Sequence, residues 1–487
     1  MPNSAASSGN VPVPSRFNLV MPVAATTDLL VFNTLQGSAA LVAMPVGQAL
    51  ASRLPKATGN RTMFRHFQEP ANHNEFATKN ELLTFQAKTS RCLSELGILV
   101  DSWEAEDTAI KRRLDDLWNP RIFKLTLSYT ASCQLACSYC FEAGRDLSKR
   151  HSPALRESTL AWAEKYLDQH PSIETVHLGL FGGEPLTDIN QANEYIDRLH
   201  QIAKSRGLDF TMSLTTNGLN LNRRLIEKWA LNGLKYLRVT LDGPPSIHDR
   251  RRPYQSGKGS FATILQGLCS IKDIDGFGIG VSTNLDEQTV GHLSDLLDIL
   301  ADSGLKDQIE VLLEPTFPST GSASEHRRRC LNSLDTRYVG SLIQSALEQV
   351  ITKGFQTPPV PGLCTPCNFV QANSFVINWS GQLFRCTFTM LDSQMVVGSV
   401  EHGLTENNDR LLAARQVTAF CLKSQCAYLP LCAGGCRYWA WCQTEDWNAL
   451  YCPRELWDQV LPLSLTHAFS LRSVPPAHQN VLTCLSP

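Results

Sequence analysis

The distribution of sixteen cysteines constrains this chain more than any other feature of its sequence. Three of them fall within residues 133–140 and nine lie between residues 364 and 452, so only Cys92, Cys269, Cys330 and Cys484 stand alone. The N-terminus has neither the basic region nor the apolar core of an export signal, and the cytosol keeps thiols reduced. Clustered cysteines then indicate metal or redox chemistry, whereas each isolated one is expected to be a small buried or inert thiol.

Length and charge narrow the function classes further. A chain of 487 residues is long enough for several domains. Its net charge is only -2 and its acidic and basic residues are mixed along the chain, so we expect no nucleic-acid partner. No apolar run approaches the roughly 18 residues that a membrane span requires. We therefore expect a cytoplasmic protein with no membrane partner.

The N-terminal part predicts a disordered segment and then a small α+β module. Residues 1–15 are rich in Ser, Pro, Asn and Ala and lack the apolar content to pack. The module covers residues 16–118. Its predicted strands are 17–24, 28–35 and 38–44, and its predicted helices are 46–54, 79–96 and 106–117.

From residue 122 short apolar runs alternate with helical stretches, which is the pattern of βα units around a parallel sheet. Candidate strands cover residues 123–128, 175–181, 209–215, 236–241, 278–284 and 308–313. They predict an α/β fold, a partial (β/α)6 TIM-like barrel over residues 119–355, with one more helix at 334–353. Prolines then mark a boundary. The second group of cysteines occupies residues 356–460, and residues 461–487 form a tail.

Cys133, Cys137 and Cys140 lie in the loop that follows the first predicted barrel strand. At CxxxCxxC spacing, a tight loop can turn three thiolates inward to hold three irons of a 4Fe-4S cluster. The fourth iron would stay open for a small bidentate ligand. The alternative is zinc, which would require a fourth Cys or His, and neither follows Cys140 closely.

This spacing, with Tyr139 before the third cysteine and a strand before the loop, resembles the radical S-adenosylmethionine (SAM) superfamily. Gly182, Gly183 and Glu184 end the second strand and look like the GGE motif of that family, which binds the SAM amino group. Glycine there allows close approach of the backbone to the ligand. Read alone, the same residues would be only a turn.

Strand ends farther along the barrel resemble the family's other SAM contacts. The residues implied are Asn217 after the third strand, Thr240 at the end of the fourth, where related enzymes usually have Ser, Arg252 in a segment like HDxxR, and Asn284 after the fifth strand. Arg252 would approach the SAM carboxylate, although a solvated basic turn is the alternative. Such sites gather at the C-terminal ends of barrel strands, because the loops there converge on one pocket.

The resemblance also implies a mechanism. A reduced cluster passes one electron to SAM at the open iron, and SAM breaks into methionine and a 5′-deoxyadenosyl radical that abstracts hydrogen from an unactivated carbon. The cofactor supplies this chemistry while the barrel positions the reactants and excludes water. The electron would come from a donor such as flavodoxin or ferredoxin.

The second group of cysteines resembles the SPASM extension of radical SAM enzymes, which binds auxiliary clusters. The resemblance implies two further 4Fe-4S clusters, making three in all. Their ligands would be Cys364, Cys367, Cys386 and Cys436 for the first, and Cys421, Cys426, Cys432 and Cys452 for the second. The usual CxxC is here Cys421-x4-Cys426, so the extra Cys442 could replace a ligand of the second cluster. Zinc at one of these sites is the alternative.

The substrates of this family are mostly peptides and proteins. Anaerobic sulfatase maturases carry Asp after the GxxxxC cysteine, and Thr387 stands there instead, which disfavours that activity. The strands and helices of residues 16–118 resemble, in their order, the winged-helix modules that bind the leader of a precursor peptide as an added edge strand. A plain structural cap is the alternative.

These features together predict a radical SAM peptide maturase. It would abstract hydrogen from a side chain of a ribosomally made precursor peptide and form a carbon-carbon, ether or thioether crosslink. Sulfatase-maturase-like protein oxidation is one alternative. A non-catalytic iron-sulfur carrier is the other, but it would not need the GGE residues, the polar strand ends and the open-iron triplet together.

Overall fold

The computed structural model describes residues 12–22, 28–43, 50, 87–316, 335–358 and 367–470. The chain folds into two compact units. The smaller unit comprises Met1–Leu117, Gln416–Gly434 and Leu465–Pro487, and the larger comprises Trp118–Arg415 and Gly435–Ser464. The second group of cysteines is therefore divided between the two units.

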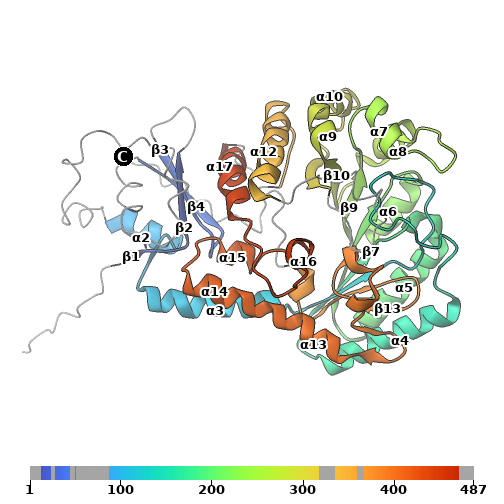
Figure 1. Cartoon of the computed structure of the whole chain (residues 1–487), viewed down its shortest axis with the longest axis horizontal. Helices are drawn as coiled ribbons and strands as arrows, with labels where there is room; N and C mark the ends of the chain where they lie inside the picture. Colours follow the sequence, from blue (N-terminus) through green and yellow to red (C-terminus); the bar gives the residue numbers. More distant parts are fainter. Residues whose placement is uncertain are drawn as a thin grey trace, which may run out of the picture. The chain divides into compact units, whose positions relative to one another are not determined.

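The larger unit is built on a sheet whose first six strands are parallel neighbours in chain order (Figure 1). They are β6 (Ile122–Leu127), β7 (Thr175–Leu180), β8 (Asp209–Thr216), β9 (Leu234–Thr240), β10 (Gly278–Leu285) and β11 (Glu310–Pro315). Each lies where the sequence predicts a barrel strand. The prediction of an α/β fold with a large, mostly parallel sheet is confirmed.

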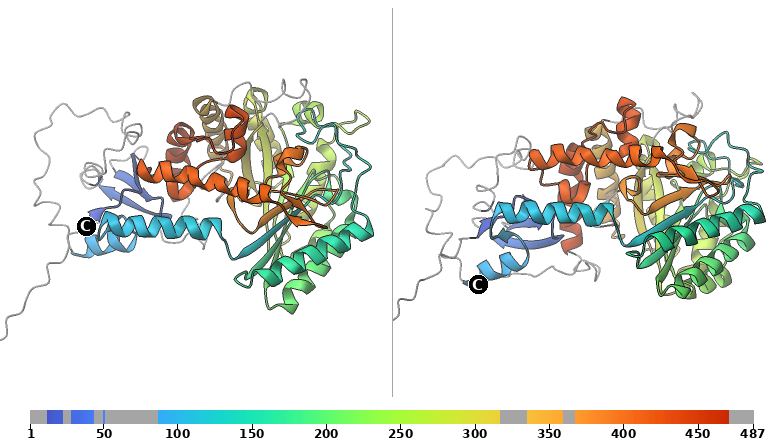
Figure 2. Two further views of the ribbon diagram at one scale, coloured as in Figure 1. Left: turned by 60° about the horizontal axis from the view of Figure 1, so that its bottom comes forward. Right: turned by 90° about the horizontal axis from the view of Figure 1, so that it is seen from below.

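Helices follow these strands and pack on the sheet, with α5 against β7 and β8, and α6 against β9 (Figure 2). They are α4 (Pro153–Gln169), α5 (Ile189–Ser205), α6 (Arg223–Leu231), α7 (Pro245–Arg251), α8 (Phe261–Ile271), α9 (Glu287–Gly291), α10 (Leu293–Asp302) and α12 (Thr336–Thr352). Polar side chains cap several of them: Ser152 precedes α4, Asp188 precedes α5 and Asn222 precedes α6, and each accepts a hydrogen bond from a backbone N–H of the first turn. Because the six strands are parallel, their carboxyl ends lie at one edge of the sheet.

The sheet continues beyond β6 into the region of the second cysteine group. β12 (Ser374–Ile377) pairs in parallel with β6, and Phe375 lies opposite Leu125. Three antiparallel strands follow, namely β13 (Gln382–Phe384), β14 (Gly398–Ser399) and β15 (Gly403–Leu404). None of these strands was predicted from the sequence, because strands this short show no alternation.

An aromatic cluster fixes β12 to β6, the first of the parallel strands. Phe123 of β6 stacks on Tyr166 of α4 at a centroid distance of 5.0 Å, and Phe375 of β12 meets Trp162 edge-on at 5.2 Å. Such buried aromatic pairs stabilise a core beyond their buried area. The remaining helices of the C-terminal region are α13 (Glu406–Leu412), α14 (Val417–Lys423), α15 (Leu429–Cys432), α16 (Arg437–Thr444) and α17 (Arg454–Ser470).

The smaller unit contains the predicted three-stranded sheet, an antiparallel meander of β2 (Asn18–Pro22), β3 (Asp28–Asn33) and β4 (Ser38–Ala43). Its helices include α2 (Ala87–Glu95) and α3 (Trp103–Trp118), while the predicted helix at 46–54 lies outside the described residues except for Leu50. Cys92 packs against the core of this unit and is disulfide-bonded, contrary to the expectation of an isolated thiol.

Residues 13–15 form ordered structure in this unit, although they belong to the segment 1–15 that was expected to be disordered. Strand β1 (Val13–Pro14) pairs with β5 (Leu99–Val100), and Ser15 is fully buried. The Ser15 hydroxyl donates a hydrogen bond to the buried Glu106 and accepts one from Asn33 Nδ2 at 3.0 Å. Composition does not reveal such a pairing of buried polar side chains.

None of the helices in the described ranges combines the length and the hydropathy that a membrane crossing requires.

Candidate active site

Cys133, Cys137 and Cys140 lie in the loop after β6, and each is partly accessible to solvent. The three thiols are near enough for each of the other two to influence the charge on Cys137. Desolvation by the surrounding protein raises the pKa of Cys137 to about 12 and raises those of Cys133 and Cys140 as well. Thiols in this setting are neutral unless a cation joins them, and iron supplies that positive charge. The three side chains therefore fit a 4Fe-4S cluster.

Two N–H donors point at the sulfurs of this loop. Asn217 Nδ2 lies 3.7 Å from Cys133 Sγ, and Arg145 Nη1 lies 3.5 Å from Cys140 Sγ. Donors of this kind stabilise thiolate ligands and tune the potential of a cluster. Asn217 was predicted from the sequence, whereas Arg145 was not.

The cysteine loop is held by the segment that follows α7. Ala136 N donates to Pro253 O and Ser138 N to Arg251 O, both at 2.9 Å, and Gln255 N donates to Gln134 O at the same distance. The backbone of this segment thus pairs with the loop as a short antiparallel ladder.

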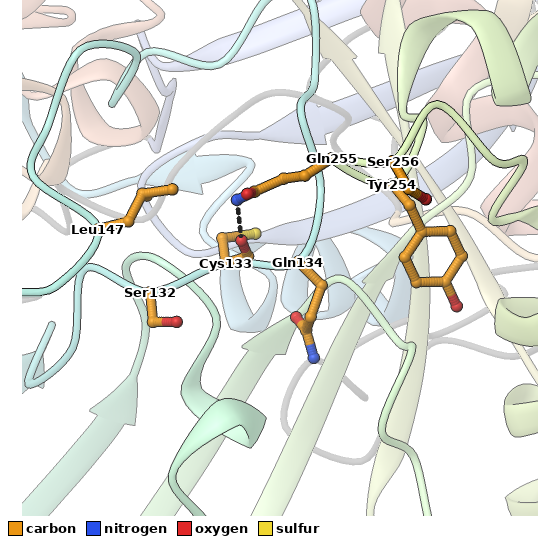
Figure 3. Close-up of a pocket in the computed structure, with 7 residues that line it drawn as sticks. All are labelled: Ser132, Cys133, Gln134, Leu147, Tyr254, Gln255 and Ser256. Atoms are coloured by element: carbon orange, nitrogen blue, oxygen red, sulfur yellow. Dashed lines mark hydrogen bonds between the residues drawn. The ribbon is translucent and has the colours of Figure 1, made fainter.

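A pocket of about 390 Å³ opens beside this ladder (Figure 3). Its lining residues are Ser132, Cys133, Gln134, Leu147, Tyr254, Gln255 and Ser256. Gln255 Nε2 donates to the Cys133 carbonyl at 2.6 Å. Cys133 is therefore the cysteine of the triplet that borders the pocket.

Gly182 and Gly183 turn the chain at the end of β7 with φ of +74° and +51°. A Cβ on Gly182 would lie 1.9 Å from Ser128 Oγ, and one on Gly183 would lie 2.5 Å from the Thr130 carbonyl oxygen. Gly182 therefore leaves room for the Ser128 side chain and Gly183 for the backbone at Thr130, in addition to the ligand approach that the sequence suggested. Gly183 N donates to Glu142 Oε2 at 2.8 Å.

Glu184 is buried and links the ends of β7 and β8. Its carboxylate accepts hydrogen bonds from Leu186 N at 2.9 Å, Thr216 Oγ1 at 2.7 Å and Asn217 N. A carboxylate offers about four lone-pair positions, so about one remains for a ligand. Glu184 thus orients Asn217, a role that the motif did not indicate.

Tyr139, Asp242 and Asn284 meet at the ends of β9 and β10. The Tyr139 hydroxyl donates to Asp242 Oδ2 and accepts from Asn284 Nδ2 at 3.0 Å. Asn284 N also donates to Asp242 Oδ1 at 2.9 Å. The predicted residue Asn284 is thereby joined to the cysteine loop.

Arg252 lies in the same cluster and is only 7% exposed, which excludes a solvated basic turn at this position. Its Nη1 donates to the Tyr139 hydroxyl at 2.6 Å, while its buried Nε has no hydrogen-bond partner. An orphaned buried donor of this kind matches a carboxylate ligand. Arg251 lies over the Tyr139 ring at 4.9 Å, and the third arginine of the run, Arg250, is exposed.

Thr240 ends β9 and is half-buried, with Ser282 of β10 beside it in register. The hydroxyls of Ser282 and Ser128 are buried without a hydrogen-bond partner. Together with Arg252 Nε they leave polar positions near the strand ends that a polar ligand can satisfy.

Aromatic contacts bring two segments of the second cysteine group near the first loop. Phe388, two residues after Cys386, packs on Phe141, the neighbour of Cys140, at a centroid distance of 5.0 Å. Phe388 also stacks on Tyr438, two residues after Cys436, at 5.3 Å. Phe388 is 41% exposed despite these contacts.

The predicted auxiliary ligands are spread over both units. Cys364 lies outside the described residues. Those in the larger unit are Cys367, Cys386, Cys436 and Cys452, and those in the smaller unit are Cys421, Cys426 and Cys432, while the extra Cys442 is in the larger unit. Within the described ranges, no three His, Cys, Asp or Glu side chains converge as a single metal ion requires.

Residues 127–300 match the family model described as the radical SAM superfamily. The chain is 23% identical over 226 residues to Fe-coproporphyrin III synthase of Methanosarcina barkeri, covering 46% of this chain and 52% of that protein. It is 31% identical over 150 residues to a serine-type anaerobic sulfatase-maturating enzyme of Bacteroides thetaiotaomicron, covering 29% of this chain and 34% of that enzyme. The chain thus spans about half or less of the length of these relatives.

Among solved structures, the fold resembles that of anSMEcpe with bound AdoMet, with a TM-score of 0.54 and 17% identity over 72% of this chain and 99% of that one. The same enzyme with AdoMet and the Cp18Cys peptide gives a TM-score of 0.52 and 18% identity, over 72% of this chain and 98% of that one. This likeness shows a shared fold. Residues 127–300 are a radical SAM domain.

Proposed function

We propose that this chain is a radical SAM peptide maturase, which abstracts hydrogen from a side chain of a ribosomally made precursor peptide and forms an oxidative crosslink. The observation that carries the proposal is the cysteine loop. Three thiols are near one another and desolvated there, and two of them receive N–H donors. An electron would come from a protein such as flavodoxin or ferredoxin.

Cys133, Cys137 and Cys140 would hold a 4Fe-4S cluster, and SAM would bind next to it at the strand ends. When bound, this pair supplies one-electron cleavage of SAM to a 5′-deoxyadenosyl radical. The Nε of Arg252 would orient the carboxylate of the ligand, since it is a buried donor with no partner. Gly182, Gly183, Glu184, Asn217, Thr240 and Asn284 would complete the binding site. The burial of Gly182, Glu184 and Asn217 would help to keep water from the reactive centre.

Two auxiliary clusters in the SPASM-like region belong to the same proposal. Cys364, Cys367, Cys386 and Cys436 would bind one, and Cys421, Cys426, Cys432 and Cys452 the other. The contacts of Phe388 with Phe141 and Tyr438 support the first assignment, because they bring the segments of Cys386 and Cys436 close together. A nearby auxiliary cluster would accept the second electron of an oxidative crosslink.

The smaller unit offers a place for the leader of a precursor peptide. Strands β2 and β4 are the edges of its three-stranded sheet. A peptide that adds a strand to such an edge gains affinity from backbone hydrogen bonds, so its sequence can vary. A peptide substrate is further supported by anSMEcpe, an enzyme of similar fold that was solved with AdoMet and a peptide.

Protein oxidation of the sulfatase-maturase kind is the second candidate. The 31% identity to a serine-type anaerobic sulfatase-maturating enzyme favours it. Thr387, which begins the short 3-10 helix Thr387–Thr389, stands where the resemblance calls for a carboxylate base. A threonine hydroxyl is a far weaker base than a carboxylate, so the peptide crosslink remains the preferred reaction.

The proposal is tested with full-length protein purified and reconstituted without oxygen. Three clusters predict about twelve irons and about twelve sulfides per chain. Reduction with dithionite in the presence of SAM should release 5′-deoxyadenosine, and incubation with a precursor peptide should yield a product that lacks a pair of hydrogen atoms per crosslink. Fully reconstituted protein that releases no 5′-deoxyadenosine would overturn the proposal. A sulfatase peptide oxidised in place of a precursor would favour the second candidate.

A further inference from the structure

Asp242 connects more parts of the candidate site than any of the residues predicted from the sequence. Its side chain is fully buried. One carboxylate oxygen accepts from the Tyr139 hydroxyl, and the other accepts from Asn284 N at 2.9 Å and Asn284 Nδ2 at 3.2 Å. Arg251 Nε lies 3.7 Å from Asp242 Oδ2, the oxygen that Tyr139 contacts. A single side chain just beyond the end of β9 thus contacts the cysteine loop, β10 and α7.

The Asp242 backbone begins a closed circuit of hydrogen bonds. Asp242 N donates to His248 Nδ1 at 3.1 Å, so His248 carries its proton on Nε2, which donates to Ser260 Oγ at 3.0 Å. Ser260 Oγ in turn donates to the Arg252 carbonyl at 2.6 Å.

The second half of the circuit returns to the carboxylate. Arg252 Nη1 donates to the Tyr139 hydroxyl at 2.6 Å, and that hydroxyl donates to Asp242 Oδ2. Every donor in the circuit points the same way around it. The His248 ring and the hydroxyls of Ser260 and Tyr139 each accept one bond and donate the next, an arrangement in which hydrogen bonds strengthen one another. The circuit therefore fixes Tyr139 and Arg252 relative to each other.

We propose that Asp242 is a positioning residue. Through Tyr139 it holds the cysteine loop in place, and through the circuit it orients the guanidinium of Arg252. Tyr139 stands between Cys137 and Cys140, so a fixed phenol limits how those two thiols turn. This inference rests on the proposed function, since it assigns Asp242 to the binding of SAM at the cluster.

The variant Asp242→Asn tests this role with little change of shape. The Tyr139 oxygen already accepts from Arg252 and Asn284, so an amide NH2 facing it finds no acceptor. In the flipped orientation the NH2 group meets the backbone N–H of Asn284 instead. Either orientation leaves a buried donor unpaired. The variant Tyr139→Phe breaks the same circuit from the other side.

The readout is the electron paramagnetic resonance signal of the reduced cluster in the reconstituted full-length protein, titrated with SAM. We expect each variant to weaken SAM binding by about tenfold or more, as for the loss of a hydrogen bond to a charged group. The double variant should bind about as weakly as the single ones, because the changes share one circuit. Iron and sulfide content are measured alongside.

Tyr236→Phe is the matched control, because Tyr236 also donates its hydroxyl to a carboxylate, that of Glu310 at 3.0 Å, but near the start of β9. It should bind SAM as the wild type does. A wild type whose signal does not respond to SAM would overturn the proposed function. A responsive wild type together with an equally responsive Asp242→Asn variant would overturn this inference alone. Additive losses in the double variant would also contradict it.

Discussion

Asn217 Nδ2 lies 3.7 Å from the sulfur of Cys133, so a side chain at the end of β8 contacts the cysteine loop that follows β6. The backbone of Asn217 is held by the buried carboxylate of Glu184. A hydrogen bond to a ligand sulfur favours the reduced, more negative state of a cluster.

Asn217→Ala is therefore expected to lower the reduction potential of the cluster at the triplet. A hydrogen bond worth about 1 kcal/mol corresponds to about 40 mV for one electron. The potential is read from a redox titration followed by the cluster's electron paramagnetic resonance signal. Asn193→Ala is the control, since its carbonyl oxygen accepts from Trp229 Nε1 in the helical layer. An unchanged potential in Asn217→Ala would remove Asn217 from the cluster environment.

Gly182→Ala should destabilise the larger unit, because its Cβ would overlap Ser128 Oγ and its φ is +74°. Gly207→Ala is the matched control, with φ of +68° and no atom within 4 Å of the added Cβ. The positive φ alone costs about 1 kcal/mol, and the overlap should add about 2 kcal/mol or more. Thermal unfolding of both variants measures the difference. Equal losses would mean that the close approach to Ser128 is not needed.

The buried side chain of His151 should make the folded protein less stable in acid. Burial lowers its pKa to about 4, and Nε2 donates to the Asn378 carbonyl at 2.8 Å while Nδ1 accepts from Tyr195. In the unfolded chain His151 binds a proton near pH 6.5. The stability that the neutral, buried His151 contributes is therefore fully present above pH 6.5 and is lost as the pH falls toward 4. It amounts to about 3 kcal/mol at most. His151→Gln should flatten the fall of the unfolding midpoint between pH 7 and 5. A fall as steep as in the wild type would assign the acid sensitivity to other groups.

Phe388→Ala separates substrate binding from SAM cleavage. Phe388 is 41% exposed and packs on Phe141 next to the cysteine loop, so a substrate side chain near the radical would contact it. Truncation should slow peptide modification by about tenfold, the usual loss when an aromatic residue that contacts a partner is replaced by Ala. Release of 5′-deoxyadenosine without peptide should stay near the wild-type rate. Leu231→Ala, an exposed residue at the end of α6, is the control. Equal loss of both activities would point to damage of the cysteine loop instead.

The six parallel strands could be predicted because each is a short stretch rich in apolar residues that is followed by a helical pattern. Strand β12 could not, since four residues such as Ser374–Ile377 carry no period of their own and gain their place only by pairing with β6. The end of the segment 1–15 was misjudged for a related reason, because Ser15 is ordered by the distant Glu106.

Some residues of the candidate site could likewise be predicted from the sequence and others could not. The triplet and the residues Asn217, Arg252 and Asn284 follow from spacing and from position in the βα pattern. Asp242 and His248 lie between Thr240 and Arg252 in the sequence, but their roles depend on hydrogen bonds to Tyr139 and Ser260, which no spacing reveals. The sequence does offer one signal for Asp242, since a carboxylate directly after a buried strand faces the site edge.

The most direct test of the account compares the iron content and SAM cleavage of the wild type with those of a variant that replaces Cys133, Cys137 and Cys140 by Ala. Purified and reconstituted without oxygen, the variant should hold about four irons fewer per chain and release no 5′-deoxyadenosine on reduction with SAM. An unchanged iron content, with 5′-deoxyadenosine still released, would contradict the assignment of the cluster to these three residues.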